Sequence, residues 1–391
     1  VISKIKPWSN GTVYELEKCP FNADHKRTAR IVRFASGALA FGCFHNSCSD
    51  KDWHALRDLL EPGWREYKRS TEGKRAETQA QALIRLAESA ELFHDSSMNA
   101  YATFPVESHR ETWPIHAKGF RRWLARAFYQ CEGRPPGSQA MQDALGVLEG
   151  KAIYDGKEYP VFIRIAGIEG RIYIDLANET WDVIEVTPDG WQVTSKPSVK
   201  FRRARGMLPL PRPIAGGSIE ELRPFVNVAD DEAWVLLVAW LVAALRPTGP
   251  YPVLPLQGEQ GSAKSTTARV LRMLIDPNSC ALRTIPQDER DLMIAASNGW
   301  IVAFDNLSGT PIWLSDAICR LATGGGFSTR ELFTDREETL FDAMRPVILT
   351  GIDALVERHD LIDRAIILNL PRIPDERRRD EEIFWLDFEK V

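Results

Sequence analysis

The spacing of apolar residues changes along the chain and separates an N-terminal module from the rest. Within residues 1–62, two short β-type runs at 29–34 and 38–42 precede a helical stretch at 50–60. Residues 63–78 are rich in Lys, Arg, Glu, Ser and Gly and contain hardly an apolar position, which is the composition of a linker. We therefore expect a small module that a linker joins to the remaining chain.

The next stretch, residues 79–215, changes from a helical to an alternating period. Apolar positions at helical spacing predict helices over 79–94, 119–129 and 139–148. Short β-branched and aromatic runs between turn residues then predict an antiparallel meander, with strands at 159–165, 171–176, 181–186 and 191–193. This stretch is predicted to be an α+β domain of unknown role.

Residues 216–391 are predicted to form an α/β domain. A buried helix at 233–245 precedes a strand, a Gly-rich loop, a helix and further apolar strands, an order typical of a parallel sheet covered by helices. The connector before this domain, 196–217, is rich in Pro, Arg and Gly and contains a basic patch at 200–205. That patch is either a solvated loop or a nucleic-acid contact.

The composition is that of a globular protein with two or three domains: 391 residues, 44% hydrophobic and 26% charged. The longest apolar run is shorter than the roughly 18 residues that a membrane span needs, so we expect no membrane segment. Six cysteines are too few for a disulfide scaffold, and half of them lie near the N-terminus, which indicates a metal site in a reducing compartment, the cytoplasm. The sequence after Val1 has no charged stretch followed by an apolar one, so we expect no signal peptide, and whether the chain is a fragment of a longer protein is left open.

The formal charge of −5 is distributed unevenly. Residues 1–75 carry 14 Lys and Arg against 9 Asp and Glu, whereas residues 251–391 carry 16 against 23. Because an acidic chain binds nucleic acid poorly, such binding has to come from local basic features, of which the N-terminal segment is the most obvious. A charged surface that only contacts solvent would account for this uneven charge equally well.

A phosphate-binding loop is the clearest chemical motif in the chain. It follows an apolar strand at 251–256, precedes a helical stretch, and reads G-x-x-x-x-A-K-S, one residue away from the consensus. Small residues let backbone N–H groups turn towards phosphate oxygens, and the next helix presents its positive end to them. The predicted nucleotide-binding residues are Gly258, Glu259, Gln260, Gly261, Ser262, Ala263, Lys264, Ser265 and Thr266.

Two residues of this loop have predicted roles, and a third departs from the consensus. Lys264 is expected to reach the β and γ phosphates of ATP, and Ser265 to ligate magnesium. Ala263 stands where the consensus has glycine, and its Cβ predicts ordinary right-handed helical torsions there.

The expected partner of the magnesium ion is a carboxylate on a neighbouring strand. The buried run 299–304 ends in Asp305, which we predict to be this metal-side acid. Asn306 follows, at a position where many ATPases have Glu. Its amide can orient water but cannot take a proton from it, so the identity of the catalytic base is left open.

Two pairs of metal-type ligands lie in the N-terminal module, Cys19-x5-His25 and Cys43-x4-Cys48. Zinc prefers four thiolate or imidazole ligands in a tetrahedron, and such a site holds together a module too small for a large core. We predict zinc at these four residues, with His45 as an alternative to His25. Buried thiols without a metal are the competing interpretation.

The C-terminal region resembles a known family. The phosphate-binding loop, Asp305, the buried strand at 345–351 and the Arg-containing strand at 363–368 are similar to the AAA+ ATPase core of superfamily 3 helicases. The same core is found in the primase-helicases of phages, plasmids and integrative elements. The resemblance covers residues 220–391 and implies a P-loop ATPase.

The resemblance also implies roles for Thr350 and Arg364. Thr350 ends the fourth strand, where the family places a sensor of the γ-phosphate, usually Asn. Arg364 lies just before the fifth strand, at the position of an arginine finger that completes the ATP site of a neighbouring subunit. A structural salt bridge is the alternative role for Arg364.

A DNA-binding hairpin is a further implication of the resemblance. The segment 324–340 is similar to the loop that grips single-stranded DNA inside the ring of such helicases, with Arg330 and Arg336 as candidate phosphate contacts. Ion pairs are the alternative for both arginines, with acidic partners at Asp335, Glu337 and Glu338.

Residues 15–60 resemble the zinc ribbon that precedes the motor in many mobile-element primase-helicases. The family works as a homo-oligomeric ring, a hexamer, and a primase or polymerase domain often lies further upstream. No part of a primase active site is visible in this chain, so priming is not assigned to it.

Together these patterns predict an ATP- and magnesium-dependent DNA motor. It would be the helicase-like component of a phage or mobile-element replication protein and act on single-stranded or forked DNA. The alternative is an ATP-driven switch or loader that binds nucleic acid or a protein partner without unwinding. Three departures from the family's usual residues, at Ala263, Asn306 and Thr350, predict slower ATP hydrolysis and so favour this alternative.

Overall fold

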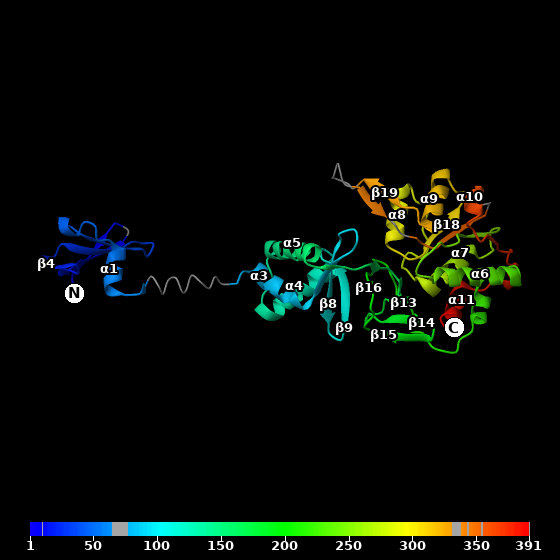
Figure 1. The fold of residues 1–391 in the computed structure, drawn as a ribbon, viewed down its shortest axis with the longest axis horizontal. Coiled ribbons are helices and arrows are strands. Elements are labelled where there is room, and N and C mark those ends of the chain that lie inside the picture. The colour runs from blue at the N-terminus through cyan, green and yellow to red at the C-terminus, as the bar shows by residue number, and fades with distance from the viewer. Residues whose placement is uncertain (10, 65–76, 331–337, 342–343, 353–354, 391) are drawn as a thin grey trace. The chain divides into compact units, whose positions relative to one another are not determined.

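The computed structural model describes residues 1–9, 11–64, 77–330, 338–341, 344–352 and 355–390. The chain divides into two compact units, Val1–Thr78 and Gln79–Val391 (Figure 1). The division falls at the end of the segment 63–78, for which the sequence predicts a linker. Most of that segment, residues 65–76, lies outside the described residues.

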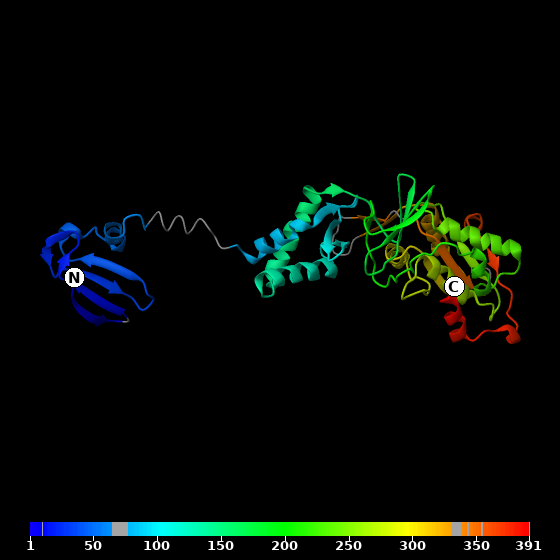
Figure 2. The ribbon, with the colours of Figure 1, turned by 90° about the horizontal axis from the view of Figure 1, so that it is seen from below.

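A four-stranded antiparallel sheet forms the body of the N-terminal unit, in the order β1 (Ile2–Trp8), β2 (Gly11–Leu16), β5 (Ala29–Arg33) and β6 (Leu39–Cys43). A separate ribbon and a 3-10 turn precede the only helix described in this unit: β3 (Lys18–Cys19), β4 (Asn22–Lys26), η1 (Asn46–Cys48) and α1 (Trp53–Leu60). Figure 2 shows this unit in blue.

Helix α1 packs on one face of that sheet. Leu56 of the helix shares a buried cluster with Leu16, Ala29 and Phe41 of three strands. The Asp52 carboxylate accepts a hydrogen bond from the N–H of Ala55 at 2.8 Å, which caps the first turn and explains why the helix starts at 53 rather than at the predicted 50.

The second unit begins with three helices beside a mixed sheet. The helices with their short 3-10 extension are α3 (Gln79–Leu86), η2 (Ala87–Ser89), α4 (Lys118–Glu132) and α5 (Ser138–Tyr154). The sheet has the order β10 (Lys157–Glu158), β7 (Glu91–His94), β8 (Ala100–Val106) and β9 (His109–Pro114). The core between them contains Phe104, Phe120, Leu124 and Leu145.

The predicted helix over 79–94 is wrong beyond residue 89. Residues 91–94 are strand β7, which pairs with β8. Strands β8 and β9 also lie in a stretch without a predicted element. Cross-strand pairing, which depends on residues distant in sequence, overrides the weak helical period here.

An antiparallel meander is present, as predicted, with consecutive strands paired: β12 (Ile165–Ile168), β13 (Arg171–Asp175), β14 (Val183–Thr187) and β15 (Gly190–Thr194). The prediction of its first strand at 159–165 is wrong, because β12 begins only at Ile165 and residues 161–162 pair elsewhere. A short parallel pair accompanies the meander, formed by β11 (Val161–Phe162) and β16 (Lys200–Phe201).

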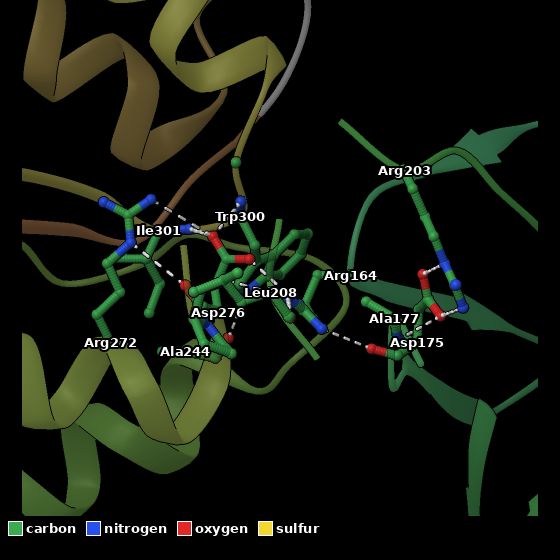
Figure 3. A network of polar contacts seen from close by, with 12 residues as sticks. Arg164, Asp175, Ala177, Arg203, Leu208, Ala244, Arg272, Asp276, Trp300 and Ile301 are labelled. Atoms are coloured by element: carbon green, nitrogen blue, oxygen red, sulfur yellow. Dashed lines mark hydrogen bonds and ion pairs between the residues drawn. The ribbon is translucent and has the colours of Figure 1, made fainter. Parts of the chain in front are cut away.

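A buried polar network crosses the predicted boundary between residues 215 and 216 (Figure 3). Arg164 is fully buried, and its Nε donates to Asp276 Oδ1 at 3.1 Å. Its other guanidinium nitrogens donate to the carbonyl oxygens of Asp175 at 2.9 Å and Leu208 at 2.8 Å. The meander therefore packs directly against the region that carries the phosphate-binding loop.

A parallel sheet forms the centre of that region, in the order β18 (Val302–Leu307), β21 (Val347–Gly351), β17 (Leu254–Gln257) and β22 (Leu368–Asn369). The strand that ends at Asp305 was expected beside the strand before the loop. That expectation is wrong, because β21 lies between β18 and β17.

Helices cover both faces of this sheet (Figure 1). One face packs against α6 (Asp231–Ala244) and α7 (Lys264–Ile275), and the other against α8 (Glu289–Ser297), α9 (Ile312–Thr323) and α10 (His359–Ile362). Alternate strand residues face the two layers, as with Val302 and Ala303 of β18. This is the P-loop-like α/β core that the sequence predicts.

The remaining elements lie at the margins of the core: η3 (Ile219–Phe225), the strand pair β19 (Phe327–Arg330) and β20 (Glu338–Phe341), η4 (Asp375–Arg377) and α11 (Glu381–Phe388). Among the described residues, no helix combines the length and the apolarity needed to cross a membrane.

Candidate functional site

The phosphate-binding loop joins β17 to α7, as the motif predicts. Gly258 and Gly261 have φ values of 151° and 84°, where glycine is favoured. A Cβ at Gly258 would lie 2.5 Å from the carbonyl oxygen of Leu370, and one at Gly261 would lie 2.6 Å from Arg378 Nη2. The positive φ values favour glycine at both positions, and at Gly258 the close approach of the Leu370 backbone also excludes a Cβ.

Ala263 lies immediately before α7, with φ of 59° and ψ of 31°. The prediction of right-handed torsions at this residue is therefore wrong. The chain has to turn sharply from the loop into the helix, and the turn imposes left-handed torsions whether the residue is Gly or Ala. The Cβ adds a strain of roughly 1 kcal/mol.

The Lys264 ammonium is held inside the loop. Its Nζ donates to the carbonyl oxygens of Gly258 at 2.7 Å and Glu259 at 2.8 Å. Burial lowers the pKa of Lys264 from its usual value, and the charge of Asp305 partly opposes this shift. A partly desolvated cation that binds neutral carbonyl oxygens would gain by exchanging them for charged phosphate oxygens.

Three predicted residues converge at the carboxyl ends of the parallel strands. Ser265 Oγ donates to Asp305 Oδ1 at 2.7 Å, and Thr350 Oγ1 donates to the same oxygen at 2.5 Å. The N–H of Asn306 donates to Thr350 Oγ1 at 3.0 Å. Although β21 lies between β18 and β17, Asp305 of β18 thus reaches the first residues of α7. Thr350 of β21 contacts both Asp305 and Asn306 and holds this arrangement together.

Asn306 has an unusual backbone conformation. Its φ is 56°, and the pairing of β18 with β21 is irregular between Phe304 and Leu307. Asn tolerates left-handed torsions better than most residues. The side chain is exposed and supplies an amide, not a carboxylate, next to Asp305.

Arg364 lies at the opposite edge of the sheet from the loop. Its carbonyl oxygen accepts a hydrogen bond from Val253, just before β17, whereas the loop follows the far end of β17. The guanidinium donates to the carbonyl oxygen of Asp360, and its Nη1 is 3.9 Å from the Asp360 carboxylate. Arg364 is therefore half-exposed at a sheet edge distant from the phosphate-binding motif of its own chain.

The predicted DNA-binding hairpin is described in part. Strands β19 and β20 are antiparallel, and Arg330 lies opposite Glu338 in their register. Arg336 and the acidic residues Asp335 and Glu337 lie outside the described residues.

Two residues of the site were missed by sequence reasoning. The guanidinium of Arg378 lies directly against Gly261, and its Nη1 is 3.0 Å from Asp375 Oδ1. Asn227 Nδ2 donates to the loop carbonyl of Ser262 at 2.9 Å. Neither has a motif around it, although Arg378 belongs to a run of three arginines after the last strand.

Two cations of the basic patch at 200–205 contact other residues of the same unit. Lys200 forms an ion pair of 2.5 Å with Glu91, and Arg203 forms one of 2.7 Å with Asp175 and stacks on the Trp181 ring at 3.9 Å. These partners account for Lys200 and Arg203 without a nucleic acid.

The four predicted zinc ligands come together in the N-terminal unit. The ligand atoms of Cys19, His25, Cys43 and Cys48 all lie within 4.8 Å of one another. Two tetrahedral ligands of one zinc ion, at about 2.1–2.3 Å from it, are roughly 3.5–3.8 Å apart, so a small contraction fits this group to the metal. The donor set of three thiols and one imidazole is typical of structural zinc.

The geometry favours His25 over His45 as the imidazole ligand. His25 Nδ1 faces Cys43 Sγ at 3.8 Å and Cys48 Sγ at 3.5 Å, while its Nε2 lies 3.4 Å from Ser47 Oγ. His45 is outside the ligand group and stacks on the His25 ring at 3.8 Å. A ligand histidine whose second nitrogen is hydrogen-bonded is the usual arrangement at zinc sites.

The thiols of this group differ in acidity. Burial acts to raise the pKa of Cys43, but hydrogen bonds from the Thr28 hydroxyl and the His45 N–H outweigh it, so that the pKa is lowered. Burial, together with the neighbouring Cys19 thiol, raises the pKa of Cys48. Bound zinc would favour the thiolate form of all three cysteines.

Residues 219–391 match the model of one protein family. Its description is the replication protein of actinomycete integrative conjugative elements. The match includes the whole phosphate-binding loop together with Asp305, Thr350 and Arg364, and it supports a replication-associated role for this region. No protein of curated function matches the chain.

Solved structures give more distant likenesses. The apo form of the NrS-1 C-terminal region is 12% identical with a TM-score of 0.42, over 78% of this chain and 65% of that one. JCV helicase with a bound acetamide compound is 14% identical with a TM-score of 0.31, over 45% of this chain and 52% of that one. This chain thus spans less than two thirds of the NrS-1 region.

Proposed function

We propose that residues 216–391 bind and hydrolyse Mg-ATP and that the chain is a DNA motor in the replication of a mobile element. One observation carries the ATPase proposal: Ser265, Asp305 and Thr350 meet beside a loop built to hold phosphate. The family match to a replication protein over the same residues supports the biological setting.

The oxygen atoms at this point fit a magnesium ion. Ser265 Oγ and Asp305 Oδ1 are 2.7 Å apart, close to the roughly 2.9 Å between adjacent ligands of an octahedral ion with bonds of 2.0–2.1 Å. When bound, the ion would neutralise charge on the β and γ phosphates. Thr350 holds the Asp305 carboxylate through its own hydrogen bond and so orients the oxygen that faces Ser265.

The loop and Lys264 would supply the remaining positive potential. The N–H groups of the loop would bind phosphate oxygens, α7 would add the positive end of its dipole, and the Lys264 ammonium would exchange the Gly258 carbonyl for a phosphate oxygen. Phosphoryl transfer needs mainly such positioning and charge neutralisation. Asn306 would orient the attacking water.

We also propose that Arg364 acts on the ATP of a neighbouring subunit, in a homo-oligomeric ring such as a hexamer. Its place at the sheet edge remote from its own loop supports a role across an interface. The β19–β20 hairpin, with Arg330 and Arg336, would contact single-stranded or forked DNA inside the ring. In the N-terminal unit a zinc ion would be structural, held by Cys19, His25, Cys43 and Cys48.

ATP turnover by the purified chain, with and without single-stranded DNA, tests the motor proposal. We expect turnover that DNA stimulates several-fold and that Lys264→Ala abolishes. Mixing Lys264→Ala with Arg364→Ala chains should restore part of the activity if the finger acts between subunits, because some interfaces then combine an intact loop with an intact arginine.

Slow turnover that DNA does not change would instead support the switch or loader. Asn306 is the specific observation that favours this second candidate, since no carboxylate follows Asp305 to take a proton from water. Unchanged activity in Lys264→Ala would contradict both proposals.

A further inference from the structure

The sheet of the N-terminal unit has two different faces, which the strand register separates. Residues paired across antiparallel strands point to the same side. The row Tyr14, Ile31 and Phe41 therefore belongs to one face, and Ile31 and Phe41 place it against α1 and the zinc ligands. On the other face, two rows run across the strands: Lys4–Glu15–Arg30–Gly42 and Lys6–Val13–Val32–Ala40.

This second face forms a shallow groove of about 360 Å³. Its floor is made of small and aliphatic residues, among them Val13, Ala40 and Gly42. Aromatic rings stand at both ends: Trp8 is 51% exposed at one end, and Phe44 is 72% exposed at the other. Exposed rings of this size around an open floor mark a binding surface.

Both rings are held in place by neighbours. The Phe34 ring packs edge-on against Trp8 at 6.0 Å between centroids. The Arg30 guanidinium lies over Phe44, 4.6 Å from the ring centroid. A ring that is already oriented loses little conformational entropy when a ligand stacks on it.

The charges along the groove identify the partner. Lys4, Lys6 and Arg30 share the face with one acidic residue, Glu15, which pairs with Lys6 at 2.9 Å and with Arg30 at 3.3 Å. The net positive charge suits a polyanion, and the flat rings suit nucleobases, which every single-stranded nucleic acid presents. An acidic peptide would satisfy the cations but would leave both rings unused.

We propose that this groove binds single-stranded nucleic acid, with bases stacked on Trp8 and Phe44 and phosphates near Lys6 and Arg30. The site is separate from the β19–β20 hairpin and from the ATP loop, so it does not depend on the proposed motor. It would give the chain a second, ATP-independent contact with its substrate strand.

Fluorescence anisotropy with a dye-labelled 15-nucleotide oligo-dT tests the proposal. The full zinc-loaded chain is used without ATP, and every variant also carries Lys264→Ala. We expect Trp8→Ala and Phe44→Ala each to weaken binding about 5- to 100-fold, the range found when one stacking ring is removed. Trp8→Phe and Phe44→Tyr should bind nearly as the parent, and Lys6→Ala should flatten the salt dependence.

Trp191→Ala is the matched control, because this tryptophan of β15 is 46% exposed but lies in the other unit. Zinc content is measured for each variant, since Phe44 follows the ligand Cys43, and an unchanged ratio shows that the unit is intact. An oligo-rU arm distinguishes DNA from RNA as the source of the strand.

Three results would overturn the proposal. The first is unchanged affinity in Trp8→Ala and Phe44→Ala with full zinc content. The second is equal binding of a blunt 15-base-pair duplex, whose bases cannot stack on the rings. The third is displacement of oligo-dT by poly-glutamate with no effect of either ring, which would mark a general anion surface.

Discussion

Asp276 is the residue whose removal should damage the second unit most, because four groups depend on its carboxylate. It ends α7, is 1% exposed, and accepts hydrogen bonds from Arg164 Nε at 3.1 Å and from the N–H groups of Trp300 at 2.9 Å and Ile301 at 3.2 Å (Figure 3). Arg272 Nη2 lies 3.9 Å from the same carboxylate. Asp276 thus joins the loop helix, the strand that leads to Asp305, and the meander.

The expected loss follows from what Asp276→Ala leaves behind. Burial lowers the pKa of Arg164 and of Arg272, and the Asp276 charge is the largest opposing influence on both, so its removal leaves two buried cations without their main counter-ion. Breaking a buried pair costs about 3–5 kcal/mol, and each unpaired buried N–H adds about 1 kcal/mol or more. Because such terms overlap, we expect a total of about 4 kcal/mol. Asp276→Asn keeps the shape of the side chain but not its charge, so it should still be destabilised by at least half as much as Asp276→Ala.

Hydrogen exchange of peptides from α7 and the start of β18 measures this effect locally. A loss of about 4 kcal/mol corresponds to exchange roughly 10³-fold faster. The matched control is Asp316→Ala, which breaks the exposed ion pair of 2.5 Å with Arg358. It should lower the free energy of opening, as measured by exchange, by no more than about 1 kcal/mol. Equal effects of Asp276→Ala and the control would refute the reasoning.

Three further changes test the sites. If zinc binds as proposed, chelation or Cys48→Ser should release one zinc ion per chain and remove exchange protection in residues 1–64 only, because the metal would hold the small core together. A metal-binding dye measures the released ion, and hydrogen exchange measures the lost protection. Thr350→Ala should lower the kcat of ATP turnover about 10- to 100-fold with a smaller change in KM, because Asp305 loses one of its two hydroxyl donors, whereas Thr350→Ser should stay near wild type. Arg378→Ala should raise the KM for ATP about tenfold in the same assay, because it would remove a charged hydrogen bond from Arg378 to ATP, and such bonds are worth about 1.5–3 kcal/mol. An unchanged KM would show that Arg378 only packs on Gly261.

Much of the α/β core can be predicted because its signals are local. The strand, the Gly-rich loop and the helix around Lys264 follow one another without interruption, so the motif and its context identify the same elements. Asp305 and Thr350 each lie near the end of an apolar run that is buried on both faces. The spacing of the cysteines similarly predicts the ligand group of the N-terminal unit.

Features that depend on distant residues could not be predicted. Strands β7, β8 and β9 have weak periodicity and are set by their pairing with one another. Arg164 and Asp276 are 112 residues apart, and nothing in either local sequence indicates a buried pair that attaches the meander to the core. The position of Arg378 against Gly261 is likewise a product of the fold.

The backbone torsions explain two residues that differ from those usual in P-loop ATPases, Ala263 in the loop and Asn306 after Asp305. Ala263 and Asn306 have φ values of 59° and 56°, so both residues occupy left-handed positions beside the predicted phosphate and metal oxygens. At Ala263 the left-handed torsions that glycine adopts readily are retained at a modest strain. At Asn306 the left-handed torsions favour Asn over Glu for reasons of conformation alone, independent of any need for a base. The absence of a carboxylate at residue 306 is therefore weak support for the switch, and the response of ATP turnover to DNA is the property that separates it from the motor.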